Sequence, residues 1–216
     1  MTDLTDIDRT HLRRAIDLAA LAAERGDRPF GAVAVDRDGA VIAEGANAVS
    51  SIGDVTTHAE LVAITVATAA GKAEDLRGAT VYASGEPCPM CSAAMVWAQV
   101  GRIVFAASAA EFGQILPGGP SFTLTCAELV ASSNVPVEVS GPHLGEEALA
   151  VFRAAAPRGR PPRGGGGGGP GGAGGGGAGG GGGGGAGPRG PPPKRCWKSN
   201  TKLIAEILVA IQVVRR

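Results

Sequence analysis

The sequence predicts a three-layer α/β/α sandwich built on a mixed sheet of about five strands. Three observations lead to this fold class. Segments with helical apolar periodicity alternate with short apolar β runs through the first part of the chain. An early hairpin signal makes one strand pair antiparallel, and the later β runs are apolar throughout, as in strands covered on both faces. A domain of about 150 residues is long enough to bury such a core.

The N-terminal part predicts a helix followed by a hairpin. Residues 8–24 repeat apolar side chains on one helical face, which favours a helix. The short apolar runs 31–36 (GAVAVD) and 40–44 (AVIAE) predict two strands. Asp38-Gly39, which lies between them, is typical of a two-residue hairpin turn.

Helices and strands then alternate after a polar loop over residues 45–55. Helices are predicted over 58–70, 89–99, 127–131 and 145–152. Strands are predicted over 79–83, 102–106 and 136–139, and a loop rich in Gly and Pro over 114–122. Because hairpin, helix and strand signals all fall within residues 1–153, this range is predicted to be one domain.

The composition changes abruptly after that domain. Residues 154–200 are dominated by Gly, Pro and Arg, which cannot bury enough apolar surface to offset chain entropy, so we expect a disordered linker. Residues 201–216 are mostly apolar and predict a helix. Two interpretations of this tail stay open: a poorly ordered extension, or a basic linker and helix that binds RNA, a membrane surface or a partner.

The net charge of zero hides two opposite halves. Residues 1–153 hold 10 Lys/Arg and 19 Asp/Glu, a net charge of −9, whereas residues 154–216 hold 10 Lys/Arg and one Glu, a net charge of +9. Phosphate contacts need Lys and Arg. The domain itself is therefore poorly suited to nucleic acid, and we expect nucleic acid to bind, if at all, through the basic tail.

The four cysteines are too few for a disulfide framework and favour a reduced compartment. The acidic first 14 residues lack the apolar stretch of a signal peptide, and no apolar run reaches the length of a membrane span. We therefore expect a cytoplasmic protein without a membrane partner.

One motif pair carries chemistry. His58-Ala59-Glu60 opens one predicted helix, and Cys88 and Cys91 open the next with a spacing that places both sulfurs on one side of its first turn. One His and two Cys supply three zinc ligands and leave a fourth position open for water, as in catalytic zinc sites. Glu60 is then a carboxylate free to move protons. The alternative is a structural zinc with a fourth ligand, for which Cys126 and His143 are the candidates in the domain.

The segments Pro29–Leu61 and Thr80–Phe105 resemble the cytidine deaminase-like superfamily, whose signature is H-x-E followed by P-C-x-x-C. They are most similar to its branch of guanine deaminases, yeast-type cytosine deaminases and tRNA adenosine deaminases. The resemblance covers residues 8–153. It implies one zinc ion per chain held by His58, Cys88 and Cys91, proton transfer by Glu60, and a homodimer.

The resemblance also implies a substrate pocket. Asn47 matches the asparagine that hydrogen-bonds the base, and the backbone N–H of Ala59 matches the group that holds the substrate. Phe30 and Trp97 match aromatic positions that line the pocket, where they would stack on a flat heterocycle. From the residues alone, Asn47 is equally a turn residue, and both aromatic residues are equally core residues.

These features predict a zinc-dependent hydrolytic deaminase that converts the exocyclic amine of a free, guanine-like nucleobase to a carbonyl and releases ammonia. Two alternatives stay open: a tRNA-specific adenosine deaminase, and a deaminase-fold binding module associated with RNA. One departure bears on the substrate. Guanine deaminases carry an acidic pair before a Ser-Phe in the region that closes the pocket, whereas Gly119-Pro120 precede Ser121-Phe122 here. Either Glu111 replaces the missing acid, or the substrate is another base such as cytosine, isocytosine, adenine or a triazine.

Overall fold

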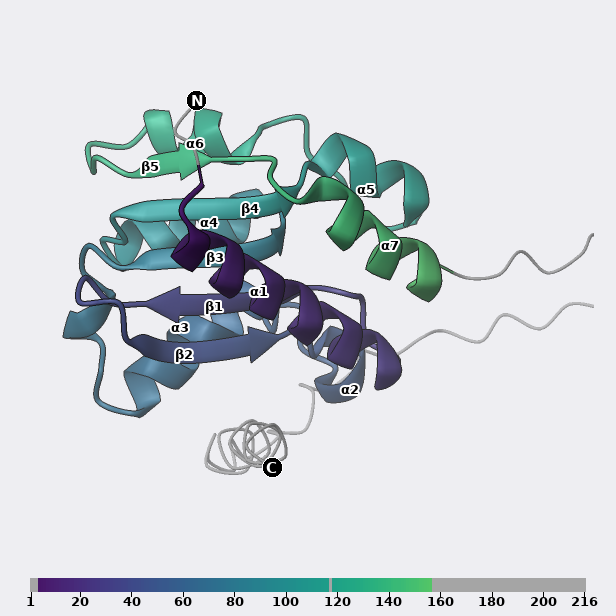
Figure 1. The fold of residues 1–216 in the computed structure, drawn as a ribbon, viewed down its shortest axis with the longest axis horizontal. Coiled ribbons are helices and arrows are strands. Elements are labelled where there is room, and N and C mark those ends of the chain that lie inside the picture. The colour runs from purple at the N-terminus through teal and green to yellow at the C-terminus, as the bar shows by residue number, and fades with distance from the viewer. Residues whose placement is uncertain (1–3, 117, 157–216) are drawn as a thin grey trace, which may run out of the picture. The chain divides into compact units, whose positions relative to one another are not determined.

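The computed structural model describes residues 4–116 and 118–156 (Figure 1). The strands are β1 (Gly31–Val35), β2 (Val41–Ala46), β3 (Thr80–Gly85), β4 (Arg102–Ala107) and β5 (Glu138–Ser140). The helices are α1 (Asp6–Glu24), α2 (Val49–Ile52), α3 (Ala59–Ala69), α4 (Pro89–Trp97), α5 (Ala109–Ile115), α6 (Cys126–Ala131) and α7 (Gly145–Ala155), with a 3₁₀ turn at Glu74–Leu76.

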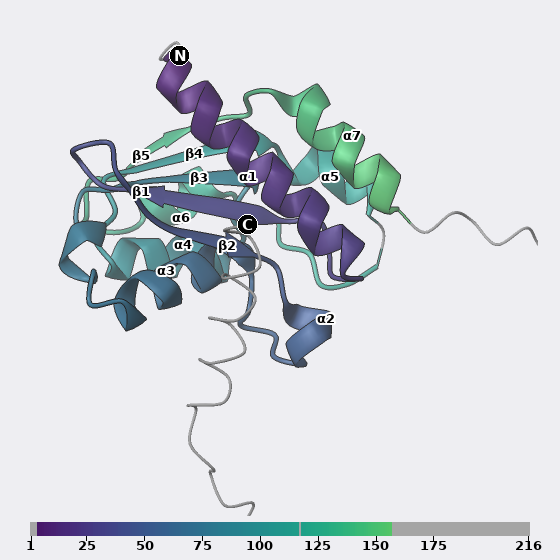
Figure 2. The same cartoon turned by 60° about the horizontal axis from the view of Figure 1, so that its bottom comes forward.

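The five strands form one mixed sheet in the order β2-β1-β3-β4-β5. Strand β1 is antiparallel to both β2 and β3, while β3, β4 and β5 run parallel. Helices α1 and α7 cover one face of the sheet, and α3, α4 and α6 cover the other (Figure 2). The structure thus confirms the predicted three-layer sandwich with a mixed sheet of five strands.

The core consists of two layers because side chains along each strand alternate between the faces. On the face of α1 and α7, Val33, Val104 and Phe152 belong to one buried cluster. On the face of α3, α4 and α6, Val81 and Ile103 belong to the other. Both faces of the central strands are therefore buried, which explains why these strands are apolar throughout.

The structure differs from the sequence-based expectation in the hairpin and in two helices. Strand β1 ends at Val35 and β2 begins at Val41, so the expected two-residue turn is a longer loop. The Asp36 carboxylate accepts hydrogen bonds from the backbone N–H groups of Asp38 and Ala40 and stabilises this loop. The short helices α2 and α5 lie where the sequence predicts no helix.

Helix α7 continues to Ala155, beyond the end of the helix predicted over residues 145–152. The predictions of a disordered linker over the rest of 154–200 and of a helix over 201–216 fall outside the described residues. Across the part of the chain that the structure does describe, none of the helices combines the length and the apolar character needed to cross a membrane.

Candidate active site

The mixed topology brings four predicted site residues to one edge of the sheet. Cys88 follows the carboxyl end of β3. Because β1 is antiparallel to β3, its amino end, preceded by Phe30, lies at that same edge. Strand β2 pairs Ala46 with the start of β1, so Asn47 leaves the sheet beside it. His58 immediately precedes α3, which packs against β2.

Gly45 allows α3 to come close enough to place His58 near this edge. A Cβ atom at Gly45 would lie 2.1 Å from the carbonyl oxygen of Ala59 and 2.7 Å from the backbone nitrogen of Ala63. Both distances are far inside van der Waals contact with backbone, which cannot move aside. Only glycine therefore permits this backbone-to-backbone packing of β2 on the first turn of α3.

His58, Cys88 and Cys91 form a compact ligand group. The Nδ1 atom of His58 lies 3.5 Å from the Sγ atom of Cys88 and 3.6 Å from that of Cys91, and the two sulfurs are 3.6 Å apart. Zinc bonds of about 2.3 Å to sulfur and about 2.0–2.1 Å to nitrogen in a tetrahedron require ligand separations of roughly 3.5–3.8 Å. The donor types and the separations both fit zinc, and the three side chains are arranged to hold a metal ion.

Helix starts position two of the three ligands. His58 is the N-cap residue of α3, and Cys88 is the N-cap residue of α4. An N-cap side chain usually accepts a hydrogen bond from its own helix, as Thr5, Ser108 and Thr125 do at the starts of α1, α5 and α6. In α3 and α4, neither N-cap side chain does so. Both side chains are thus free to turn toward a metal.

The protonation states of the group are coupled. The hydrogen bond with Cys91 lowers the pKa of the Cys88 thiol to about 4, and the same contact raises the pKa of Cys91. The hydrogen bond with Cys88 raises the pKa of the His58 imidazole. Zinc binds thiolates and neutral imidazole, so the binding of zinc is coupled to the loss of protons from these side chains.

Glu60 lies in the first turn of α3 and is 6% exposed. Burial raises the pKa of its carboxyl, and the neighbouring Cys88 thiolate raises it further. A carboxyl whose pKa is raised above its ordinary value is a stronger proton acceptor, as a group that both takes up and returns protons needs to be. Its position two residues from a metal ligand places that capacity beside the ligand group.

Asn47 is buried, with 2% exposure, and its side chain has one defined contact. Its Oδ1 atom accepts a hydrogen bond from the backbone N–H of Val49 at 3.2 Å, which fixes the orientation of the amide because that N–H can only donate. Among the described residues, the Nδ2 group donates no hydrogen bond. No fully buried side-chain nitrogen or oxygen lacks a partner there, so the Nδ2 atom itself is not fully buried. Its two N–H groups are available to a substrate oxygen or ring nitrogen.

Ala59 is the first helical residue of α3 and is fully buried. Because no side chain caps this helix within the described structure, its first N–H groups keep their donor capacity. The positive end of the helix dipole lies at the same place and favours an electron-rich group of a substrate.

The two predicted aromatic residues lie in different surroundings. Phe30 is half-buried and packs with Phe112 and Phe152, with ring centroids 5.2 and 5.3 Å away. Trp97, in contrast, is 86% exposed at the last residue of α4. It lies six residues beyond Cys91, or about 9 Å along the helix. Within one copy of the described chain, Trp97 thus lies apart from the ligand group along α4, and its place in a substrate pocket stays a prediction.

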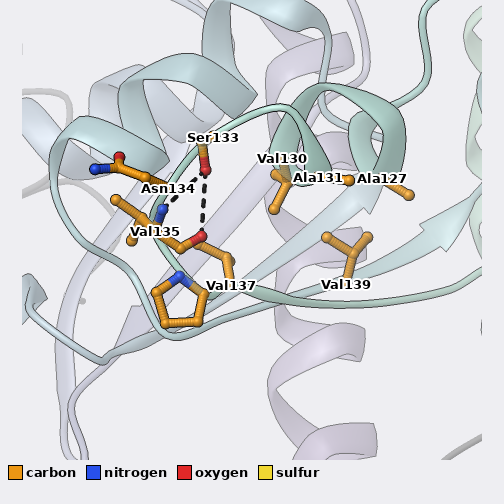
Figure 3. A pocket seen from close by; sticks show the side chains of 9 residues that line it. Ala127, Val130, Ala131, Ser133, Asn134, Val135, Val137 and Val139 are labelled. Atoms are coloured by element: carbon orange, nitrogen blue, oxygen red, sulfur yellow. Dashed lines mark hydrogen bonds between the residues drawn. The ribbon is translucent and has the colours of Figure 1, made fainter.

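A separate hollow of about 710 Å³ lies between α6 and β5 (Figure 3). Its lining residues carry no ionisable side chain: Ala127, Val130, Ala131, Ser133, Asn134, Val135, Pro136, Val137 and Val139. No predicted site residue contributes to it. Its chemistry supports neither metal binding nor proton transfer.

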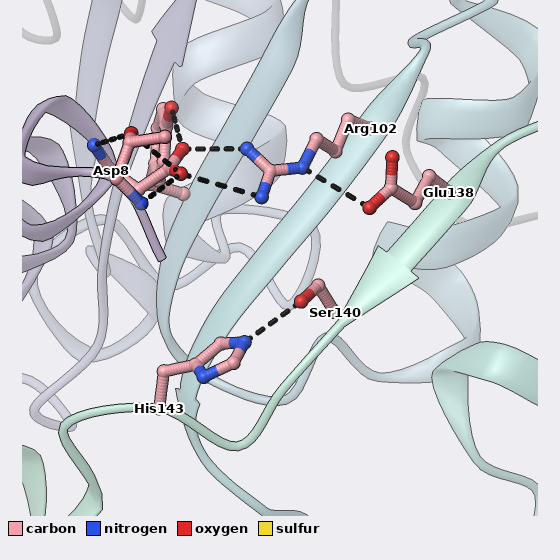
Figure 4. Close-up of polar contacts among 7 residues, drawn as sticks. Asp8, Arg102, Glu138, Ser140 and His143 are labelled. Carbon is pink, nitrogen blue, oxygen red and sulfur yellow. Dashed lines mark hydrogen bonds and ion pairs between the residues drawn. The ribbon is translucent and has the colours of Figure 1, made fainter. Parts of the chain in front are cut away.

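The two candidate fourth ligands do not join the metal group. Cys126 is buried but lies outside the group of His58, Cys88 and Cys91. The Nε2 atom of His143 lies 2.8 Å from the Ser140 hydroxyl, in a polar cluster near Arg102 (Figure 4). Among the described residues the group therefore has three ligands. Catalytic zinc sites have three protein ligands and an open fourth position, whereas structural zinc sites have four protein ligands.

Sequence reasoning missed two groups of residues that support the site. The Asp27 carboxylate accepts hydrogen bonds from the backbone N–H groups of Ser50 and Ser51, each at 2.9 Å, and so holds α2. The Glu86 carboxylate accepts hydrogen bonds from residues of two other helices. In the sequence, only the closeness of Glu86 to Cys88 could have pointed to a role for Glu86 in the site. Its hydrogen-bond donors, Ala109 and Cys126, are distant along the chain.

Comparison with known proteins agrees with this geometry. Residues 5–107 match the family model described as the cytidine and deoxycytidylate deaminase zinc-binding region. The chain is 34% identical over 151 residues to a probable cytosine deaminase of Schizosaccharomyces pombe, a match that covers 68% of this chain and 91% of that protein. It is 45% identical over 108 residues to a guanine deaminase of Bacillus subtilis, covering 48% of this chain and 69% of the relative.

A solved structure supports the same relationship. It comes from a study of A-to-I editing by tRNA deaminases at the wobble position of transfer RNA. It is 32% identical to this chain, with a TM-score of 0.56, and the match covers 66% of this chain and 99% of that one. With the three metal ligands in place, the chain belongs to the zinc-binding cytidine and deoxycytidylate deaminase family.

Proposed function

We propose that this deaminase hydrolyses the exocyclic amine of a free nucleobase, with guanine or a related base as substrate. The observation that carries the proposal is the group of three metal ligands with the buried carboxylate of Glu60 beside it. Such a group has the two parts that hydrolytic deamination needs, an open metal position and a proton carrier.

Each residue has a role in this proposal. His58, Cys88 and Cys91 hold zinc, which when bound supplies Lewis acidity and an activated water. Glu60 takes one proton from the water and passes it to a ring nitrogen as the water oxygen bonds to the amine-bearing carbon. It then takes the second proton from the new hydroxyl and passes it to the leaving amine. The carbon–nitrogen bond breaks, a carbonyl forms in its place, and ammonia leaves, so that amine and water are consumed in equal amounts.

Three groups orient the base. The free N–H groups of Asn47 donate to an oxygen or nitrogen on the edge of the ring. The backbone N–H of Ala59, at the start of α3, holds the substrate carbonyl. Phe30 supplies an aromatic face at the same edge of the sheet, where its ring is half-buried.

The charge of the domain supports a small base over RNA. Residues 1–153 carry a net charge of −9, which repels a polyanion. The relatives named as a probable cytosine deaminase and a guanine deaminase point in the same direction. The homodimer and the cytoplasmic location that the sequence suggested remain predictions.

A second candidate is a tRNA-specific adenosine deaminase. It is favoured by the solved tRNA deaminase structure, of which this chain covers 99% at 32% identity. In that case the ten Lys and Arg residues of 154–216 would supply the phosphate contacts that the acidic domain lacks.

A panel of substrates decides between the candidates. Ammonia release is measured with the full-length zinc-loaded protein on guanine, cytosine, isocytosine, adenine, guanosine, adenosine and unmodified tRNA, with Glu60→Gln as a blank. Turnover of a free base supports the proposal. Inosine formation in tRNA without turnover of any base supports the second candidate. A protein with one zinc per chain and no turnover on the whole panel would instead indicate a binding module.

A further inference from the structure

Glu86 lies two residues before the metal ligand Cys88, in the turn that follows β3. Its carboxylate bridges two helices: Oε2 accepts a hydrogen bond from the backbone N–H of Ala109, and Oε1 accepts one from that of Cys126, each at 3.0 Å. These are the first helical residues of α5 and α6. The connection between β3 and α4, residues 86–88, contains the metal ligand Cys88 and is called the ligand turn below. The half-buried carboxylate of Glu86 thus joins the ligand turn to the starts of α5 and α6.

Capping alone does not explain this arrangement, because both helices are already capped by their own sequences. Ser108 and Glu111 form a complete capping box at α5, and Thr125 and Glu128 form one at α6. Each box satisfies the N-cap and third helical N–H groups. Glu86 binds the first helical N–H of each helix instead. What it adds is a connection between those helices and the ligand turn.

The ligand turn has two further attachments. The backbone N–H of Glu86 donates to the carbonyl of Ala107 at 2.8 Å, which continues the β3–β4 pairing. The Ser92 hydroxyl donates to the carbonyl of Pro87 at 3.2 Å from within α4. These contacts tie the turn to the sheet and to α4, while the Glu86 carboxylate ties it to α5 and α6.

Through α5, the contacts of Glu86 also extend to Phe30, one of the predicted substrate-binding residues. Phe112 of α5 packs edge-on against Phe30, with ring centroids 5.2 Å apart. Gly85 makes room for both rings, since a Cβ atom there would lie 3.0 Å from Phe30 and 3.1 Å from Phe112. A shift of α5 relative to Glu86 would therefore move Phe30 as well as the ligand turn.

We propose that Glu86 is a positioning residue of the active site, which fixes the sulfur of Cys88 by anchoring the ligand turn to α5 and α6. The proposal rests on the role of Cys88 as a zinc ligand. Residues that orient metal ligands typically affect metal affinity or activity by about 10–100-fold when replaced. The glutamine variant keeps the size of the side chain but retains one acceptor oxygen, so one of the two N–H groups would face an amide NH₂.

The experiment compares Glu86→Gln with Glu111→Gln and Glu128→Gln, which weaken the caps of the same two helices without touching the ligand turn. All are full-length proteins loaded with Zn²⁺ or with Co²⁺. The readouts are the rate of zinc extraction by a chelator, the visible absorption of the cobalt–thiolate site, Tm, and kcat and KM on whichever substrate is active. The metal readouts need no substrate, so they remain decisive if the proposed function is wrong.

We expect Glu86→Gln to speed zinc extraction by about 10-fold and to alter the cobalt spectrum, with the cap variants within about 2-fold of the wild type despite a similar loss of Tm. Equal extraction rates and an unchanged spectrum in all four proteins would overturn the proposal. A second measurement uses the wild type alone. Removal of zinc should increase hydrogen exchange at the starts of α5 and α6 more than in α1, and an equal increase in α1 would count against the proposal.

Discussion

Arg25 donates a hydrogen bond from its guanidinium to the backbone carbonyl of Asn47 at 2.9 Å. The same guanidinium lies 3.6 Å from the buried carboxylate of Asp27, which in turn holds α2. The backbone N–H of Asn47 donates to the carbonyl of Phe30 at 2.9 Å. Asn47 is thus fixed through both of its backbone groups and through Oδ1, and among the described residues its Nδ2 group has no acceptor.

Replacement of Asn47 by aspartate should reduce kcat/KM by about 100-fold. The variant keeps the oxygen that accepts from Val49, so the backbone is undisturbed. It exchanges the two N–H donors for an acceptor oxygen, which repels the electron-rich edge of a base. Steady-state ammonia release on the active substrate measures the effect. Asn134→Asp, at an exposed position, is the control and should be neutral. Wild-type kcat/KM in the Asn47 variant would remove Asn47 from the binding site.

Glu60→Gln should retain zinc and lose at least about 100-fold in kcat. The amide is nearly isosteric with the carboxyl and fits the same buried space, but it cannot carry protons. Zinc content by elemental analysis and ammonia release are measured on the same sample. Glu24→Gln, an exposed carboxylate at the end of α1, serves as the matched control. Turnover within a few-fold of the wild type would show that another group transfers the protons.

Cys88→Ser should lose both zinc and stability. The hydroxyl is a poor replacement for the thiolate, and metal binding contributes to folding free energy. The expected result is a zinc content well below one per chain and a Tm that no longer rises when zinc is added. Cys126→Ser is the control, because Cys126 is a cysteine at least as buried as Cys88 but lies outside the ligand group. If Cys126→Ser lost zinc to the same extent, the three-ligand assignment would fail.

The sequence predicts most of the sheet because local signals determine it. Val33 and Val35 point to one face and Ala34 lies between them, and this alternation is visible as a β run. The ligands His58, Cys88 and Cys91 were predictable because their chemistry resides in short spacings. The helix α5 was not predicted, although Ser108 and Glu111 form a capping box at its start.

Long-range relationships could not be predicted in this way. The partners of Glu86 lie 23 and 40 residues further along the chain, and no local pattern links them. Trp97 shows a different limit. Resemblance matches it to a pocket position, while in one copy of the described chain it lies exposed at the end of α4, so its role stays a prediction. Sequence spacing places residues on a helix, but the packing of that helix decides what each of them contacts.

A polar cluster remote from the ligand group anchors the start of α1 to the sheet (Figure 4). The Asp8 carboxylate, on a residue that is 3% exposed, accepts hydrogen bonds from Arg102 at 2.6 Å and from the Tyr82 hydroxyl at 2.8 Å. Burial raises the pKa of Asp8, but the hydrogen bonds from Arg102, Thr5 and Tyr82 outweigh it and hold the pKa well below its ordinary value.

Asp8→Asn should therefore lower the free energy of unfolding by about 3 kcal/mol at pH 7. The substitution removes the negative charge that the guanidinium of Arg102 contacts in the folded protein. Since the folded-state pKa lies below the unfolded value of about 3.9, this stabilisation is complete above that value and is lost as the pH falls toward the folded-state pKa. Urea unfolding at pH 7, 5 and 3 should show a similar difference from the wild type at the first two values and a smaller one at pH 3. Asp6→Asn, an exposed acid in the same helical turn, is the control. A difference that stays constant down to pH 3 would show that the charge of Asp8 does not stabilise the fold.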